Sequence, residues 1–138
     1  MITYKNTKNI HDSDLRPLYV AVGWVSYTNK FKDLSALLPT SQNVLSAWKD
    51  GQLLGLVRTV GDGLSIVYVQ DLLVMPKFQN QGIGTQLMKK VIDESSNIRQ
   101  FVLITDGQEE NLAAIEFYKK LGLHTFEDTK TCGLWRII

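Results

Sequence analysis

Apolar side chains recur every three or four residues in three stretches of the chain, and this spacing predicts three amphipathic helices. The three sets are Leu15, Leu18, Tyr19 and Val22; Ile83, Leu87, Met88, Val91 and Ile92; and Ala114, Phe117, Tyr118 and Leu121. Gly23 and Gly122 directly follow the first and third sets, as expected for residues that end a helix. A further short helix is expected over Lys32–Leu38, which carries three leucines.

The start of the first helix contains a proline. Ser13 and Asp14 are candidate N-caps. With Asp14 as the cap, Pro17 falls in the first helical turn, where an N–H group has no helical partner to lose.

Runs of apolar residues between these helices predict seven strands. They cover residues 2–5, 44–49, 52–60, 64–74, 101–105, 123–126 and 132–137. Asp50-Gly51 favours a two-residue hairpin between the second and third runs, because both residues tolerate positive φ. A helix lies between Val74 and Phe101, so the strands that flank it are expected to be parallel. The predicted order β-α-α-β-β-β-α-β-α-β-β describes an α/β fold with one mixed sheet, antiparallel and parallel, flanked by helices.

Length and composition are typical of one globular domain. The chain has 138 residues, of which 44% are hydrophobic and 21% charged, and it contains no linker-like or repeated segment that would begin a second domain. No run approaches the ~18 apolar residues of a membrane helix, and the first residues lack a secretory pattern. We therefore expect a single domain over residues 1–138, cytoplasmic, with no membrane partner.

Charge and cysteine content exclude several function classes. The net charge is +1 and the basic residues are dispersed, so no nucleic-acid partner is expected. Cys132 is the only cysteine, which excludes an internal disulfide; we expect it to be a small buried residue. His11 and His124 show no metal-ligand pattern, and no metal site is expected.

The segment Asp71–Ile92 joins a predicted strand to a predicted helix through Gly82-Ile83-Gly84. A helix start presents unpaired N–H groups and the positive end of the helix dipole, so glycines there favour a bound phosphate. Close packing of the helix on a strand is the alternative explanation. A dinucleotide fingerprint would need glycine where Leu87 stands, and a nucleotide-triphosphate loop would need lysine where Thr85 stands.

The residues around these glycines resemble the GNAT superfamily of acetyl-CoA-dependent N-acetyltransferases. Gln79-Asn80-Gln81-Gly82-Ile83-Gly84 matches [QR]-x-x-G-x-[GA] after a strand ending in Leu-x-Val-x-Pro, and "NLAAIEFYKKLGL", residues 111–123, is similar to a second family segment. The specific motifs occupy Asp71–Leu123, while the element order resembles the family over the whole chain.

The resemblance implies a set of cofactor-binding residues for acetyl-CoA. The strands ending at Val74 and beginning at Phe101 would part, and the pantetheine arm would lie between them. The residues implied are Leu72, Leu73 and Val74 for the pantetheine amides; Gln79, Asn80, Gln81, Gly82, Ile83, Gly84 and Thr85 for the pyrophosphate; and Asn111 and Tyr118 on the following helix. Asn111 is also a candidate helix cap.

The resemblance also implies a catalytic role for Tyr118, as the acid that protonates the departing thiolate. Packing on the apolar stripe is the alternative. A backbone N–H near Leu73 or Val74 would stabilise the oxyanion. Asp71 is the one carboxylate within the apolar run. It is a candidate base that would deprotonate the amine through water, or a charge that only attracts a cationic acceptor; a structural hydrogen bond to a neighbouring loop is the alternative.

The acceptor pocket implied by the resemblance lies at the loop between the first two helices, Gly23–Lys30. Trp24 and Tyr27 are candidate substrate-binding residues, as an aromatic wall for an apolar or aromatic amine; Trp24 as a core residue is the alternative.

The sequence thus predicts acetyl transfer from acetyl-CoA to a small-molecule primary amine, an aralkylamine or a polyamine, by direct attack. A non-catalytic acyl-CoA-binding or regulatory domain and a protein or peptide amine acetyltransferase are the alternatives. A homodimer is possible on the family's precedent and on the pairing edge of the last predicted strand.

Overall fold

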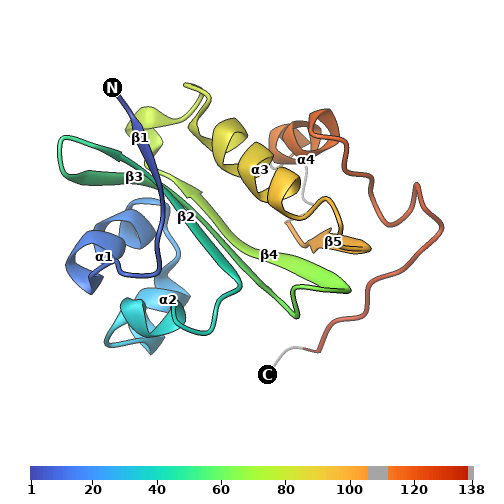
Figure 1. The fold of residues 1–138 in the computed structure, drawn as a ribbon, viewed down its shortest axis with the longest axis horizontal. Helices are drawn as coiled ribbons and strands as arrows, with labels where there is room; N and C mark the ends of the chain where they lie inside the picture. The colour runs from blue at the N-terminus through green and yellow to red at the C-terminus, as the bar shows by residue number, and fades with distance from the viewer. Residues whose placement is uncertain (106–111, 137–138) are drawn as a thin grey trace. The chain divides into compact units, whose positions relative to one another are not determined.

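The computed structural model describes residues 1–105 and 112–136 (Figure 1). The chain divides into two compact units, Met1–Ile104 and Thr105–Ile138, which we describe separately. The first unit contains β1 (Thr3–Asn6), α1 (Asp12–Ala21), α2 (Val25–Lys30), the 3₁₀ helix η1 (Leu34–Leu37), β2 (Asn43–Lys49), β3 (Gln52–Gly61), β4 (Ile66–Val74), the 3₁₀ helix η2 (Pro76–Phe78), α3 (Ile83–Glu94) and β5 (Gln100–Leu103). The second unit contains α4 (Leu112–Lys120).

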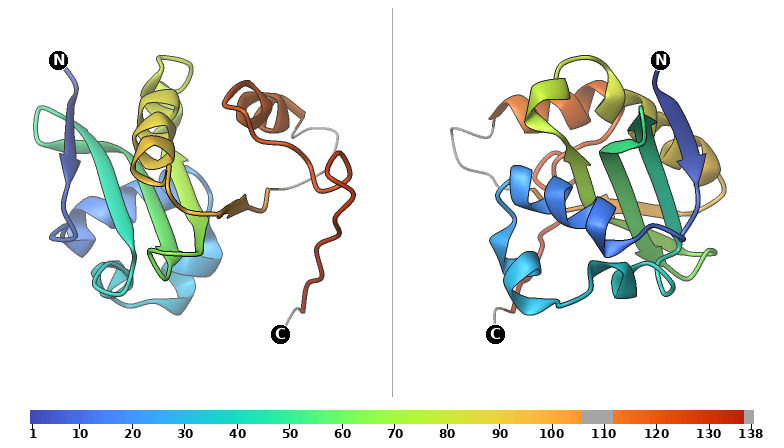
Figure 2. Two further views of the ribbon diagram at one scale, coloured as in Figure 1. Left: turned by 45° about the vertical axis from the view of Figure 1, so that its right-hand side comes forward. Right: turned by 90° about the vertical axis from the view of Figure 1, so that its left-hand side faces the viewer.

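The first unit is built on a five-stranded sheet in the order β1-β2-β3-β4-β5. The first three pairings are antiparallel, and β4 pairs with β5 in parallel. Figure 2 shows α1 and α2 on one face of this sheet and α3 on the other. The mixed α/β sheet and the parallel crossover predicted from the sequence are therefore confirmed.

Apolar side chains fill the space on both faces of the sheet. On the α1 face a buried cluster includes Leu15, Leu18 and Tyr19 of α1 together with Leu56 and Leu73 of the sheet. On the other face α3 buries four residues of its apolar stripe, Ile83, Leu87, Met88 and Val91. A Cβ added to Gly55 of β3 would lie 2.9 Å from Ile83 Cγ2 and 3.2 Å from Leu87 Cδ1, so the absence of a side chain there lets α3 approach the sheet closely.

The start of α1 differs from the prediction. The helix begins at Asp12 with His11 as its N-cap, and neither Ser13 nor Asp14 caps it, so Pro17 lies inside the helix. Asp12 is held in the first turn because its carboxylate accepts from Arg16 at 2.9 Å and from the Leu34 N–H at 2.7 Å. These contacts outweigh the loss of one helical hydrogen bond at Pro17.

The region after α1 also differs. The predicted helix over Lys32–Leu38 is only a 3₁₀ turn, Leu34–Leu37, which Asp33 caps by accepting from the Ser35 N–H. The predicted loop Gly23–Lys30 instead contains α2. A helix of six residues is too short for helical periodicity to identify, and tertiary contacts must hold it.

The two predicted strands at the C-terminal end are wrong for the described residues. Residues 121–136 contain turns and extended chain but no strand, since a strand requires a partner that an apolar run cannot supply by itself. Leu134 is 96% exposed, and Cys132 is exposed rather than buried. Gly122 has φ +94 just after α4, as expected at a helix C-terminus.

Candidate functional site

The sheet splits between β4 and β5. Their paired residues run from Ile66 with Gln100 to Val69 with Leu103. Beyond Val69, β4 continues to Val74, and in the described part of the chain no strand pairs with Gln70–Val74 on that side. This stretch therefore presents strand N–H and C=O groups on an open edge, to which an extended ligand with amide groups can add.

A β-bulge lies where the split begins. Arg58 of β3 pairs with Asp71 and the next residue, Thr59, pairs with Val69, so Gln70 is the extra residue of β4. Neighbouring residues of β3 face opposite sides of the sheet, and directly paired residues share a side. Asp71 therefore faces α1 together with Arg58, whereas Val69 faces α3 together with Thr59.

The start of α3 follows the open stretch of β4 in the chain. Gly82 is its N-cap with φ 84, no side chain caps this start, and a Cβ added to Gly82 would meet no atom within 4 Å. Gly82 is therefore required for its backbone conformation and not for packing on a strand. The N–H groups of Ile83, Gly84 and Thr85 have no partners within the helix, and such groups favour binding of an anion.

The loop between β4 and α3 contains the other predicted phosphate-binding residues. The Gln79 amide donates to the Val74 carbonyl oxygen at 3.1 Å, which ties the end of β4 to the loop. Asn80 has φ 62, a conformation that asparagine adopts more readily than most residues. Gln79, Asn80 and Gln81 are all exposed and lie beside the start of α3, as the sequence predicts.

Asp71 lies in a buried polar cluster and is 1% exposed. Its Oδ2 accepts from Arg58 Nε at 2.7 Å and from the Tyr19 hydroxyl at 2.8 Å, and its Oδ1 accepts from the Tyr27 hydroxyl at 2.8 Å. The structural hydrogen bond weighed in the sequence analysis describes these contacts better than a free base does. The partners lie on β3, α1 and α2, and not on a loop.

Both tyrosines of this cluster keep their protons. Burial, followed by the charge of Asp71, raises the pKa of Tyr19 and of Tyr27 above the ordinary value for a phenol. Each hydroxyl therefore remains a hydrogen-bond donor to the carboxylate throughout the physiological pH range.

The candidate acceptor-binding residues lie against this cluster. The rings of Trp24 and Tyr27 are stacked, with centroids 5.9 Å apart and an interplanar angle of 19°. Tyr27 also contacts the rings of Tyr19 and Phe31, with centroid distances of 5.3 and 6.0 Å. The Gln70 amide donates to the Tyr27 hydroxyl at 3.1 Å. This hydrogen bond connects the aromatic residues to the point where β4 and β5 separate.

Tyr118 belongs to the second unit. It lies on α4, its ring packs edge-on against Phe117 with centroids 5.1 Å apart, and burial raises the pKa of its phenol. Asn111 lies outside the described residues. The roles expected for these two residues on the cofactor stay predictions.

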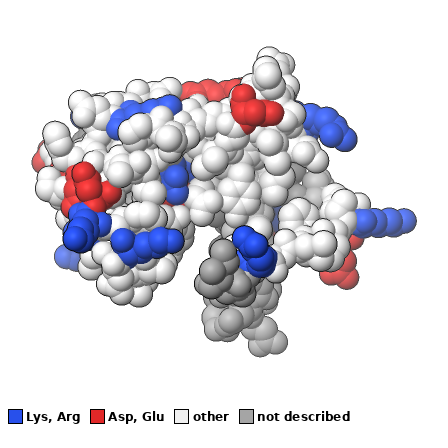
Figure 3. Space-filling view, turned by 90° about the horizontal axis from the view of Figure 1, so that it is seen from below, with Lys and Arg blue, Asp and Glu red and all other residues white. Residues whose placement is uncertain are grey.

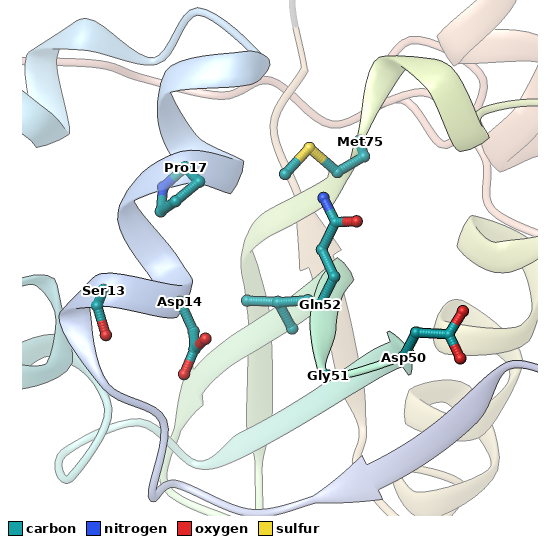
Figure 4. A pocket seen from close by; sticks show the side chains of 8 residues that line it. Ser13, Asp14, Pro17, Asp50, Gly51, Gln52 and Met75 are labelled. Carbon is teal, nitrogen blue, oxygen red and sulfur yellow. The ribbon is translucent and has the colours of Figure 1, made fainter.

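A separate pocket opens between α1 and the β2–β3 turn (Figure 4). It is lined by Ser13, Asp14, Pro17, Asp50, Gly51, Gln52, Leu53 and Met75. In Figure 4 the Met75 side chain extends toward Pro17, while the Asp50 carboxylate points away from both residues. None of the predicted site residues lines this pocket, so the candidate site remains at the split of the sheet.

Beyond the candidate site, the face in Figure 3 shows no patch of one charge, and the described residues contain no metal-ligand group or membrane-spanning helix. Basic and acidic side chains are interspersed over the face in Figure 3 and do not form a patch of one sign. Among residues 1–105 and 112–136, no three or more His, Cys, Asp or Glu side chains are grouped as a metal site would require. No helix in these same residues has the length and apolarity needed to span a membrane.

Three members of the polar cluster were missed from the sequence: Arg58, Tyr19 and Gln70. Arg58 gave a usable signal, because it is a charged residue within the apolar run Gln52–Val60. Tyr19 gave none, since it occupies an ordinary position on the apolar stripe of α1. The role of Gln70 follows from the bulge, which is a property of strand pairing and not of one strand.

An open strand edge that leads to a glycine-led helix start with no side-chain cap has the features expected of a site for an extended, phosphate-bearing ligand. The model of the Acetyltransferase (GNAT) family matches residues 8–123, and the chain belongs to this family.

Individual relatives agree with this assignment. An uncharacterised N-acetyltransferase of Porphyra purpurea is 30% identical over 121 residues, which cover 85% of this chain and 67% of the relative. A thialysine N-epsilon-acetyltransferase of Mus musculus is 36% identical over 66 residues, or 46% of this chain and 38% of the relative. The structure of a GNAT family protein from Streptococcus pneumoniae superposes with a TM-score of 0.85 at 35% identity, over 100% of this chain and 98% of that one.

Proposed function

We propose that the protein is an N-acetyltransferase that moves the acetyl group of acetyl-CoA to a primary amine of a small molecule. The observation that carries this proposal is the open edge of β4, Gln70–Val74, which leads directly to the α3 start at Gly82. The family as a whole uses acetyl-CoA, and the shape and polarity of this site fit that cosubstrate.

The two parts of the site suit the two chemical parts of the cosubstrate. The N–H groups of Ile83, Gly84 and Thr85, together with the positive end of the α3 dipole, would bind the pyrophosphate. The strand N–H and C=O groups of Gln70–Val74 that face away from β3 would pair with the amides of the pantetheine arm, except for the Val74 carbonyl, which accepts from Gln79. With the phosphates at α3, the acyl end lies toward Gln70.

The reaction forms an amide bond between the acceptor nitrogen and the acetyl carbon and breaks the thioester bond, whose electron pair leaves on sulfur. A neutral amine is required, so its extra proton must first pass to water or a base. A backbone N–H of Leu73 or Val74 would stabilise the negative charge that develops on the carbonyl oxygen. Tyr118 is the proposed donor of a proton to sulfur, because it stands in the segment that resembles the second family motif and a phenol can donate a proton to a thiolate as it forms.

The acceptor would be bound beside Gln70, with Trp24 and Tyr27 as the nearest aromatic surface. A small-molecule acceptor is supported by the mouse relative, whose name states acetylation of the ε-nitrogen of thialysine, although that match covers 46% of this chain. The sequence alone left aralkylamines and polyamines open as acceptors.

Calorimetric titration with acetyl-CoA tests the first half of the proposal, with NAD and ATP as controls. Binding confined to acetyl-CoA and CoA is expected. A panel of amines then tests turnover by release of free CoA thiol. If acetyl-CoA binds but no amine or peptide causes release of CoA thiol, the protein is a non-catalytic acyl-CoA-binding domain. If only peptides cause release, the protein is a protein acetyltransferase.

A further inference from the structure

We propose that Asp71 is a positioning residue and not the base: paired with Arg58, it fixes the Tyr27 hydroxyl beside Gln70, so that Trp24 and Tyr27 form a rigid wall that selects amines with a flat apolar group over polyamines. This inference rests on the proposed function. It assigns a role to the buried cluster and decides between the two acceptor classes that the sequence left open.

The first step concerns the carboxylate of Asp71. Three donors reach its two oxygens, from Arg58, Tyr19 and Tyr27, and the side chain has no exposed surface. A buried carboxylate whose oxygens are already bonded within the protein is out of reach of the acceptor amine. The proton of the acceptor amine therefore leaves through water.

The second step concerns the Tyr27 hydroxyl. It donates to Asp71 Oδ1 at 2.8 Å and accepts from Gln70 Nε2 at 3.1 Å and from Arg58 Nη2 at 3.4 Å. A hydroxyl has one proton and two lone pairs, so these three contacts use all of its hydrogen-bonding capacity. Its partners lie on two strands, and they fix both the position of the hydroxyl and the direction of the ring.

The third step concerns α2, which carries Tyr27. This helix has six residues, none of them fully buried, and no side chain caps its start. It therefore depends on tertiary contacts. Tyr27 supplies one anchor, and Arg16 supplies another by donating to the carbonyl oxygens of Thr28, Phe31 and Lys32. Only the Tyr27 anchor also touches the split of the sheet.

The charges around the wall decide the acceptor class. Asp71 is compensated by Arg58, Asp12 by Arg16, and Asp33 is occupied in capping η1. The Lys30 ammonium lies 5.7 Å from the Phe31 ring centroid, which adds a positive charge beside the aromatic group. Among the described residues, a polyamine would thus meet cations and acids whose oxygens are already bonded within the protein, whereas the ring of an aromatic amine would stack on the uncharged rings of Trp24 and Tyr27.

The test compares Tyr27→Phe with Tyr19→Phe. Both changes remove one hydroxyl that donates to Asp71 at 2.8 Å, but Tyr19 is buried and does not contact Gln70. With 2-phenylethylamine as the probe acceptor, Tyr27→Phe should raise KM about three- to tenfold, the cost of one net hydrogen bond, with little change in kcat. Tyr19→Phe should raise KM by clearly less than Tyr27→Phe does. Equal effects on KM would overturn the proposal.

Two further measurements complete the test. Wild-type protein should prefer 2-phenylethylamine to spermidine in kcat/KM, and the opposite preference would overturn the acceptor class. Asp71→Asn should act mainly on KM, like Tyr27→Phe. A fall in its kcat of about a hundredfold or more, the size expected for loss of a general base, would overturn the positioning role.

A readout without turnover separates this inference from the proposed function. In a background with Trp48→Phe and Trp135→Phe, the fluorescence of Trp24 should be quenched more strongly by acrylamide in Tyr27→Phe than in Tyr19→Phe, because the stacked wall has loosened. If acetyl-CoA binds but no amine reacts, the proposed function fails, and this quenching comparison alone decides whether Tyr27 is locked. Equal quenching in the two variants would show that it is not.

Discussion

The two ends of the open stretch of β4 are built in opposite ways. At the Val74 end, the loop leads to a helix start whose N–H groups have no side-chain cap and whose N-cap has no side chain at all. At the Gln70 end, Asp71, Arg58 and Tyr27 use their hydrogen-bonding groups on one another within the protein. The difference teaches where to expect a ligand. Unpaired backbone N–H groups can donate to the oxygens of a bound phosphate, whereas side chains whose hydrogen bonds are all made within the protein serve to hold the structure.

The largest expected effect comes from removing one partner of the buried ion pair at the Gln70 end of the stretch. Arg58→Met should lower the free energy of unfolding by about 3–5 kcal/mol, because it leaves the Asp71 carboxylate buried without a counter-charge. The measurement is urea denaturation. Arg16→Met is the matched control: the side chains of Arg16 and of its partner Asp12 are each 30% exposed, so its loss should lower the free energy of unfolding by clearly less than Arg58→Met does.

The double variant Arg58→Met, Asp71→Leu sharpens this prediction. With both charges gone, no buried ion remains unpaired, and much of the stability lost in Arg58→Met should return. A double variant at least as unstable as the sum of the two single variants would show that the pair contributes through its own attraction, and would contradict its description as a compensated scaffold.

The next largest effect is expected from a substitution at the N-cap of α3, which should weaken binding of acetyl-CoA. Gly82→Ala forces a side chain onto a residue with φ 84 at the N-cap of α3. The strain should shift the backbone that presents the first α3 N–H groups, and it should weaken acetyl-CoA binding about tenfold or more in a calorimetric titration. Gly51→Ala is the control, because Gly51 also has positive φ, 76°, and open space around its Cα. Each substitution should cost about 1–2 kcal/mol of stability, but only Gly82→Ala should affect binding. Equal Kd values in the two variants would remove the phosphate site from α3.

The smallest effect concerns a carboxylate with exposed donors. The Ser65 hydroxyl and the N–H groups of Leu64, Ser65 and Ile66 hold the pKa of Asp62 well below its usual value. Since the folded pKa lies below the unfolded value of about 3.9, this contribution is present above pH 4 and is lost as the pH falls. Asp62→Asn should therefore show a weaker loss of stability between about pH 4 and pH 2 than wild type. Identical acid-unfolding curves would show that this turn contributes nothing.

The open end of the site could be predicted from the sequence, because it depends on local chemistry. Glycines before an amphipathic helix indicate an anion site wherever the fold places them, and Val74 and Phe101 are far enough apart in the chain to imply a parallel crossover. The sequence also singled out Trp24 and Tyr27, although Tyr27 lies on a short helix in a segment that was predicted as a loop; their role toward the acceptor stays a prediction.

The polar cluster around Asp71 could not be predicted from the sequence, because it depends on how β4 pairs with β3. Val67, Val69, Asp71 and Leu73 alternate as if they shared one face of a strand, yet the bulge at Gln70 divides them between the two faces. The sequence of β4 alone does not show that one of its residues lacks a partner in β3. The C-terminal strands were predicted wrongly for a related reason: an apolar run shows which residues favour extended structure but not whether a partner strand is present.

Amide hydrogen exchange with and without acetyl-CoA tests the central claim most directly, because it reports on backbone groups. The claim predicts added protection at Gln70–Val74 and at Ile83–Thr85, with no change in the β1–β2 pairing at Leu45–Trp48, which serves as an internal reference. Protection at the α3 start alone would leave the open edge of β4 without a role. No change in either segment at saturating acetyl-CoA would contradict the assignment of the split as the cosubstrate site.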